Sequence, residues 1–180
     1  MAFEPWQRGE IPGPIKAVVI NKPEMVPALV KKAKKPLFIV GTGALRDEFN
    51  GKFPIDYAIR IAKGGNIPVV ATAQTVVEFK RRGFTPTARM SLMEIGGRLT
   101  DPEWSVSDNG APHDLVLMLG LGPYYMEWLV GSGLKSFAPH LKTISLNRFY
   151  QPHCSWSFPN LPVEEWYKNL EKIAQGMEKK

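Results

Sequence analysis

The chain has 180 residues, of which 44% are hydrophobic and 22% charged, and its formal net charge is +6. This length and composition predict one domain with a full hydrophobic core and exclude a mainly disordered chain. The single cysteine, Cys154, excludes an internal disulfide and an iron–sulfur cluster held by this chain alone. The three histidines are not spaced as a metal site, so we expect no metal on this chain.

The positive charge gathers at 31–35, 80–82 and 179–180. Each cluster falls where a helix is expected to finish, where cations complement the helix dipole, so we expect solvated helix ends and no nucleic-acid binding. No apolar run reaches the roughly 18 residues of a membrane span, and the first residues do not read as a signal peptide. We therefore expect a cytoplasmic protein without membrane contact.

The first half of the chain begins with an extended arm over 1–14, rich in proline and glycine, before a single nucleotide-binding-like α/β domain over 15–180. Residues 15–20 predict a short edge strand. A helix is expected over 24–35, with Pro27 tolerated in its first turn. The apolar run 37–40 predicts a buried strand.

Helices and strands also alternate in the middle of the chain. Apolar residues at helical spacing predict a helix over 55–62, and 67–72 reads as a second buried strand. Thr75 and Glu78 form a capping-box pattern that opens a helix ending at Gly83. Ser91 and Glu94 repeat that pattern for a helix through Leu99. The polar stretch 100–113 is long for a compact domain, a property often linked to function.

The last third supplies two more strands and two helices. Residues 114–120 and 141–146 predict strands, Pro123 is expected at the first position of a helix through Val130, and a last helix starts near Pro162. Strands that alternate with helices predict a three-layer, doubly wound, mostly parallel sheet of the Rossmann-like class.

A glycine turn after the first buried strand is the first candidate site. Gly41, Thr42, Gly43 and Ala44 leave the backbone open to a phosphate at the carboxyl end of a parallel strand. The dinucleotide fingerprint expects a third glycine or alanine three places on, where this chain has Arg46. A tight turn that uses glycine for steric reasons is the alternative.

Two further loops fall on the same rim of the predicted sheet. Gly120, Leu121 and Gly122 follow a strand directly, and Thr72 follows another. Because ligands of open α/β sheets bind at the carboxyl ends of the strands, these residues join the first turn as candidate cofactor contacts. Glycine used only for a tight βα turn is again the alternative.

Three tryptophans lie outside the periodic segments. Trp6 belongs to the predicted arm, Trp104 to the long polar stretch and Trp156 to a late loop. Such residues are favoured anchors of protein interfaces, so we expect interface roles unless each folds back on its own domain. No nucleophile elbow, P-loop lysine or paired carboxylates of acid–base spacing is present, so we expect no catalytic residue.

Residues 22–41, 67–72 and 114–120 together resemble the epsilon subunit family of the archaeal carbon monoxide dehydrogenase/acetyl-CoA decarbonylase–synthase complex. The same pattern of helix, basic turn, proline, apolar strand and glycine is similar to the central nucleotide-binding domain of thiamine-diphosphate enzymes. The resemblance covers about residues 15–175 and implies that domain's NAD/FAD-binding type of doubly wound fold.

The resemblance implies an accessory, non-catalytic subunit beside a large CO dehydrogenase alpha subunit, in an assembly of two alpha and two epsilon chains. It also implies help in electron transfer to FAD during CO oxidation, with the flavin over 41–44 and 120–122. The alternative is a stand-alone module that binds FAD or another nucleotide without a CO dehydrogenase partner. A homo-oligomer of the isolated chain is also expected.

Overall fold

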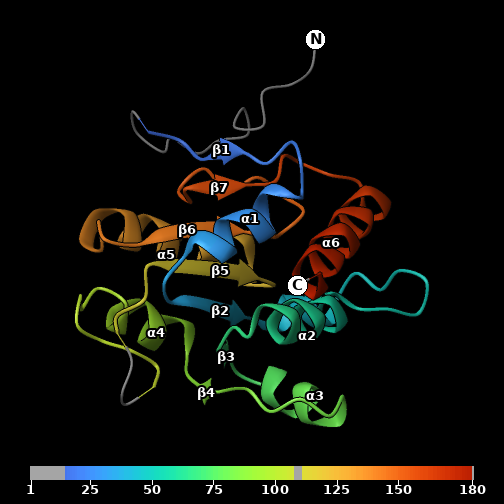
Figure 1. Ribbon diagram of the computed structural model, residues 1–180, viewed down its shortest axis with the longest axis horizontal. Helices are drawn as coiled ribbons and strands as arrows, with labels where there is room; N and C mark the ends of the chain where they lie inside the picture. Colours follow the sequence, from blue (N-terminus) through green and yellow to red (C-terminus); the bar gives the residue numbers. More distant parts are fainter. Residues whose placement is uncertain (1–14, 108–110, 180) are drawn as a thin grey trace.

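A seven-stranded parallel sheet forms the centre of the computed structural model, which describes residues 15–107 and 111–179 (Figure 1). The strands are β1 (Val18–Val19), β2 (Pro36–Val40), β3 (Val69–Ala71), β4 (Ala88–Arg89), β5 (Leu115–Leu119), β6 (Lys142–Ser145) and β7 (Trp156–Ser157). Their order is β1-β7-β6-β5-β2-β3-β4, and every neighbouring pair is parallel. The predicted arm, 1–14, lies outside the described residues.

Helices cover both faces of the sheet. They are α1 (Met25–Lys32), α2 (Pro54–Gly65), α3 (Thr75–Arg81), α4 (Leu92–Arg98), α5 (Tyr124–Phe137) and α6 (Val163–Glu178), with a short 3-10 turn η1 (Thr42–Leu45) after β2. One apolar cluster joins α1, α2, α3 and α6 to the sheet, and a second joins α4 and α5 to its other face. The expected three-layer, doubly wound α/β architecture is therefore confirmed.

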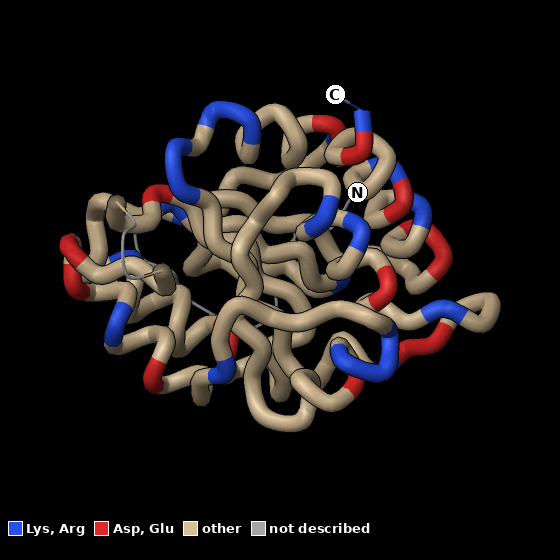
Figure 2. The backbone as a smooth tube through the Cα atoms, turned by 60° about the horizontal axis from the view of Figure 1, so that its bottom comes forward, with Lys and Arg blue, Asp and Glu red and all other residues tan. Residues whose placement is uncertain are grey.

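The charged residues lie around the outside, with both signs interspersed (Figure 2). Lys31 and Lys32 occupy the last turn of α1, and Lys80 and Arg81 the last turn of α3, as expected for cations that complement helix ends. Within the described ranges, no helix is long and apolar enough to cross a membrane.

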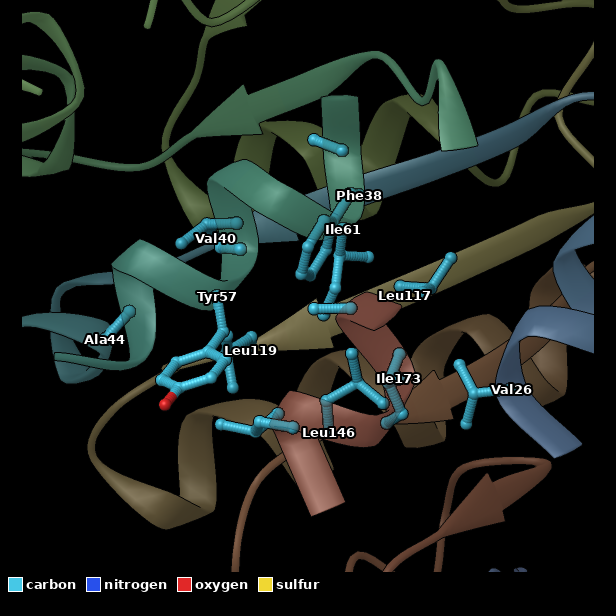
Figure 3. Close-up of a cluster of buried hydrophobic side chains, with 14 of the residues drawn as sticks. Val26, Phe38, Val40, Ala44, Tyr57, Ile61, Leu117, Leu119, Leu146 and Ile173 are labelled. Atoms are coloured by element: carbon cyan, nitrogen blue, oxygen red, sulfur yellow. The ribbon is translucent and has the colours of Figure 1, made fainter. Parts of the chain in front are cut away.

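The central strands are apolar because both of their faces are covered. Phe38 and Val40 of β2 point into the cluster beneath α2 and α6 (Figure 3), whereas Leu37 and Ile39 belong to the opposite cluster. All four side chains are fully buried, and each contributes about 1.5–3 kcal/mol relative to exposure. This two-sided burial explains why a continuous apolar run, without alternation, predicted the strand.

The order of the strands places a topological switch point between β2 and β5. From β2 the chain proceeds through β3 to β4 at one edge, then crosses back to β5 and continues through β6 and β7. The run β4-β3-β2-β5-β6-β7 has the strand order of Rossmann dinucleotide-binding folds, with β1 added at the far edge. Ligands of such sheets bind where the order reverses, outside the carboxyl ends of these two strands.

The predicted element boundaries need several corrections. Strands β4 and β7 were not predicted, because two residues are too short to show a period. Helix α1 ends at Lys32, before the expected residue 35, because the chain turns extended at Ala33. The Asp114 carboxylate then accepts hydrogen bonds from the backbone N–H groups of Lys34 (2.7 Å) and Lys35 (2.8 Å).

The helix-start predictions differ in outcome. The Ser91 hydroxyl caps α4 by accepting a bond from Glu94 N at 3.1 Å, as expected. The capping box at Thr75 is wrong, because Thr75 is buried inside α3 and its hydroxyl donates to the Thr72 carbonyl. Pro123 is the N-cap of α5, one position before its predicted place.

Candidate functional site

A cavity of about 450 Å³ lies at the switch point, where the carboxyl ends of β2, β3, β4 and β5 meet. It is lined by Gly41, Thr42, Thr72, Ala73, Arg89, Met90, Ser91, Leu92, Glu94, Leu121, Gly122 and Met126. Five of these residues were predicted as cofactor contacts: Gly41, Thr42, Thr72, Leu121 and Gly122. Another hollow, of about 630 Å³, runs along the outer side of α6 near Phe49 and Tyr167, away from the strand ends. The fold favours the first cavity as the ligand site.

The two glycine turns pack against each other behind this cavity. A methyl group on Gly41 would lie 2.4 Å from the Gly120 carbonyl oxygen, and one on Gly43 would lie 2.8 Å from the same atom. Gly43 N–H donates to that oxygen at 2.7 Å, and Ala44 N–H donates to the Gly41 carbonyl at 3.0 Å. The turn at 41–44 therefore uses its glycines and these two N–H groups for internal packing.

Gly120 is the residue on which this packing depends. Its φ is +69°, in the left-handed region that favours glycine, and a Cβ there would lie 2.2 Å from Ala44 N. Its N–H donates to Asn147 Oδ1 at 2.7 Å. The backbone of the second turn is thus held from two sides, by the first turn and by the loop after β6.

The next two residues of the second turn face the cavity. The N–H groups of Leu121 and Gly122 form no hydrogen bond with any residue in the described part of the chain. A Cβ added at Gly122 would meet nothing within 4 Å. These two donors are consequently free to meet a ligand oxygen.

The opposite wall comes from β4 and the start of α4, which the sequence prediction of the site had missed. Arg89 and Glu94 are the charged residues among those that line the cavity. Glu94 Oε1 accepts bonds from Arg98 Nε (3.2 Å) and Nη2 (3.1 Å), which leaves Arg89 as the cation on this wall. Strand β4 was not predicted, and with it the approach of Arg89 to the switch point was not foreseeable.

The remaining predicted residues lie around the cavity without lining it. Gly43, Ala44 and Gly120 form the packed layer behind it. Arg46, which interrupts the dinucleotide fingerprint, is exposed at the end of η1 and does not line the cavity. The third position of the fingerprint therefore lies directly after the 3-10 turn η1, and helix α2 begins only at Pro54.

A buried carboxyl group that was not among the predicted site residues lies behind the second turn. Glu127 lies in the first turn of α5 with 1% of its surface exposed, and Asn147 Nδ2 donates to its Oε2. Burial raises the pKa of this carboxyl to about 7, and the polar side chains of Ser145, Asn147 and Gln151 near it act in the opposite direction. Its position in an amphipathic pattern resembles that of a solvated helix glutamate, so no sequence signal distinguished it.

The predicted interface tryptophans have different surroundings. Trp104 is partly buried, its ring 5.8 Å from that of His113 and 5.9 Å from the Arg98 guanidinium carbon. Trp156 lies in β7 between β1 and β6, partly buried against the core. Trp6 lies outside the described residues. The interface roles of all three stay predictions.

Neither Cys154 nor the residues of metal-binding type form a redox site within 15–107 and 111–179. Cys154 is buried, and burial raises the pKa of its thiol well above the ordinary value. No group of three or more His, Cys, Asp or Glu side chains in these ranges could hold a metal ion.

Comparison with known proteins gives the same family throughout. The model of the family described as CO dehydrogenase beta subunit/acetyl-CoA synthase epsilon subunit matches residues 1–174. The acetyl-CoA decarbonylase/synthase complex subunit epsilon of Methanothermobacter thermautotrophicus is 35% identical over 169 residues, covering 94% of this chain and 93% of that protein. Subunit epsilon 1 of Archaeoglobus fulgidus is 34% identical, over 87% and 83% of the two chains.

Subunit epsilon 1 of Methanosarcina barkeri is 32% identical over 155 residues, or 86% of either chain. These matches extend over nearly the whole domain, including the strands and turns that form the switch-point cavity. The chain therefore belongs to the family of acetyl-CoA decarbonylase/synthase complex epsilon subunits.

Proposed function

We propose that this protein is an accessory, non-catalytic subunit that docks to the large CO dehydrogenase alpha subunit and stabilises the alpha/epsilon component. The observation that carries the proposal is family membership over nearly the full chain. The chemistry of the chain agrees with it. One buried cysteine cannot hold a cluster, so metal chemistry in the assembly belongs to another chain.

The proposed assembly contains two alpha and two epsilon chains, with Trp6, Trp104 and Trp156 as anchors on the epsilon side. Trp104 supports this role best among the described tryptophans. It lies on the loop after α4 and remains partly accessible. Interfaces concentrate their binding energy in such aromatic anchors, where truncation costs about 2 kcal/mol or more.

Co-purification tests the docking proposal. The chain and a CO dehydrogenase alpha subunit are co-expressed, and the tagged epsilon chain is isolated by affinity and size exclusion. We expect a stable complex with equal numbers of the two chains, weakened by Trp104→Ala and unaffected by Leu129→Ala, which removes an exposed apolar side chain elsewhere, on α5. Failure of the alpha subunit to co-elute would contradict the proposal.

We further propose that the switch-point cavity binds the nucleotide part of FAD, as in the central domain of thiamine-diphosphate enzymes, and so assists electron transfer. The supporting observation is the cavity itself, about 450 Å³ at the place where the strand order reverses. This cavity also favours the alternative function, a stand-alone module that binds FAD or another nucleotide.

The residues at the cavity fit a phosphate-bearing ligand better at the second turn than at the first, where Thr42 alone among residues 41–44 has an N–H group without a bond to a described residue. Leu121 and Gly122 offer backbone N–H groups, and Arg89 offers a cation on the opposite wall. Gly43 and Ala44 cannot cradle a phosphate with their N–H groups, because both are already bonded within the turns. A bound flavin would supply a redox centre, and this chain's residues would hold its nucleotide part in place.

Titration with FAD tests this second proposal, with flavin fluorescence and the thermal unfolding midpoint as measurements. Ligand at a hundredfold excess over its dissociation constant stabilises the folded state by about 2.7 kcal/mol, so binding is visible as a shift. Gly122→Val is the matched variant, because a Cβ at this position meets nothing within 4 Å and the valine side chain would occupy the cavity wall. Equal response of the two proteins, or none in either, would remove the site.

A further inference from the structure

The buried carboxyl of Glu127 connects to one end of the cavity loop formed by residues 120–124. Asn147 Nδ2 donates to Glu127 Oε2, and Asn147 Oδ1 accepts from Gly120 N at 2.7 Å. The Asn147 side chain thus connects the Glu127 carboxyl group to Gly120, whose backbone has a φ of +69°. Met126, the residue before Glu127, lines the cavity itself.

Gln151 links the Glu127 carboxyl group to the other end of the same loop. Gln151 is fully buried and within hydrogen-bonding reach of the Glu127 carboxyl group, and its Nε2 donates to the Tyr124 carbonyl at 3.2 Å. Glu127 Oε1 and Gln151 Oε1 are both buried without a hydrogen-bond partner among the residues described. A buried acceptor without a partner destabilises the fold, because it has lost its hydrogen bonds to water. A proton on the Glu127 carboxyl group would remove its buried negative charge and turn one of its oxygens into a donor for an unpaired acceptor such as Gln151 Oε1.

The groups around Glu127 do not compensate a negative charge. The Cys154 thiol stays neutral, because burial and the nearby Glu127 carboxyl group both raise its pKa. The Arg148 guanidinium, next to Asn147, is directed to Asp47 (3.6 Å) and to the Phe149 ring (4.3 Å). His153 stacks on Trp128 at 5.6 Å, and burial lowers the pKa of its imidazole, which favours the neutral form. Ser145 contributes only a hydroxyl.

We propose that protonated Glu127 is a positioning residue that fixes both ends of the Gly120–Tyr124 loop, through Asn147 at one end and Gln151 at the other. An effect of Glu127 on ligand binding rests on the proposed nucleotide cavity. The bracing of the loop by Glu127 is independent of that proposal. When the proton leaves to water, Gln151 Oε1 faces an anionic oxygen. The amide then turns its Nε2 toward Glu127 and gives up its bond to the Tyr124 carbonyl.

The pKa of the group makes this change accessible near neutral pH. Burial raises the pKa of Glu127 to about 7, so a pH interval around neutrality converts a braced loop into a loosened one. The leading effect is expected at Tyr124, with a smaller change relayed by Asn147 to Gly120.

Amide NMR of the full chain between pH 5.5 and 8.5 tests the proposal. We expect the Tyr124 and Gly120 amide signals to shift together with a midpoint near pH 7, and Glu127→Gln to abolish this titration while keeping the fold. The glutamine is neutral, can donate to Gln151 Oε1 and can still accept from Asn147. Glu165→Gln, the same change at an exposed site on α6, should leave the titration unaltered.

A second variant tests the relay. In Asn147→Ala, we expect the Tyr124 signal to titrate while the Gly120 signal no longer follows it. Loop signals that do not change with pH in the unmodified chain, or that titrate equally in Glu127→Gln, would overturn the proposal, as would a Gly120 titration unaffected by Asn147→Ala.

FAD titration at the two ends of this pH range separates the bracing from the ligand site. If both hold, affinity falls at least threefold from pH 5.5 to 8.5 in the unmodified chain, and Glu127→Gln reduces that loss. If the loop titrates but FAD binds at neither pH, the bracing stands and the proposed nucleotide site fails. Binding whose pH dependence is the same in Glu127→Gln would overturn the positioning role.

Discussion

The two glycine turns at the switch point look alike in sequence but differ in structure. The turn after β2 directs Gly43 N–H to the Gly120 carbonyl at 2.7 Å, and its glycines leave no space for a Cβ. The turn after β5 leaves the N–H groups of Leu121 and Gly122 open to the cavity. The first turn thus mainly supports the second turn, with Gly41 and Thr42 at the edge of the cavity, and the second turn offers a ligand two adjacent unbonded N–H groups. Glycine after a parallel strand does not by itself identify a phosphate site, because close approach of two loops makes the same demand.

Substitution of Gly120 is expected to have the largest effect. Gly120→Ala puts a Cβ 2.2 Å from Ala44 N at a residue with φ +69°, so the strained backbone and the steric clash add. We expect the free energy of unfolding to fall by about 4 kcal/mol. Urea unfolding measures it. Gly122→Ala, in the same turn but in open space, should stay within about 0.5 kcal/mol of the unmodified chain.

The pH dependence of stability is the next largest effect. The pKa of Glu127 is about 7 in the folded chain and ordinary in the unfolded one, so its contribution is complete below about pH 4.5 and lost as pH rises through 7. We expect a loss of about 3 kcal/mol, absent in Glu127→Gln. Urea unfolding at pH 5 and pH 8 measures it.

The difference between the two proteins isolates this contribution. Burial also lowers the pKa values of His113 and His153, which act in the opposite direction as pH falls, but they titrate in both chains. Parallel stability curves for the unmodified chain and Glu127→Gln would show that the carboxyl does not carry its proton in the fold.

Substitution of Arg89 changes the wall of the cavity formed by β4 and α4 and leaves the packed turn at residues 41–44 intact. We expect Arg89→Ala to weaken FAD binding about tenfold, or about 1.4 kcal/mol, through loss of the cation opposite Gly122. Its stability should not change, because the Arg89 side chain is exposed. Arg81→Ala removes the same charge from α3, outside the cavity, and should bind FAD normally. Equal losses in the two variants would indicate a general charge effect.

The smallest expected effect concerns the start of α4, which forms part of the same wall of the cavity. Ser91→Ala removes the hydroxyl that accepts from Glu94 N at 3.1 Å and should cost about 1 kcal/mol in unfolding free energy. Thermal and urea unfolding measure it, with Ser136→Ala on the exposed side of α5 as the control. A neutral result would show that the cap does not stabilise this wall.

Features that leave a local pattern in the sequence, such as the continuous apolar run of a buried strand, could be predicted. Strands β2 and β5 are covered on both faces, so their apolar runs identified them and their glycine turns. The features that depend on contacts between distant segments could not. Gly43 and Gly120 lie far apart in sequence but meet within hydrogen-bond distance, and Arg89 reaches the cavity from a strand of two residues. Glu127 reads as an ordinary helix glutamate until the loop after β6 buries it.

Mapping of FAD onto the backbone amides tests the central difference between the two turns most directly. Signals of the isolated chain are followed as FAD is added at pH 6. The account predicts shifts concentrated at Leu121 and Gly122, with smaller changes at Thr72 and with Gly43 and Ala44 unaffected. Shifts centred on Gly43 and Ala44, or no shift at either turn at saturating FAD, would contradict it.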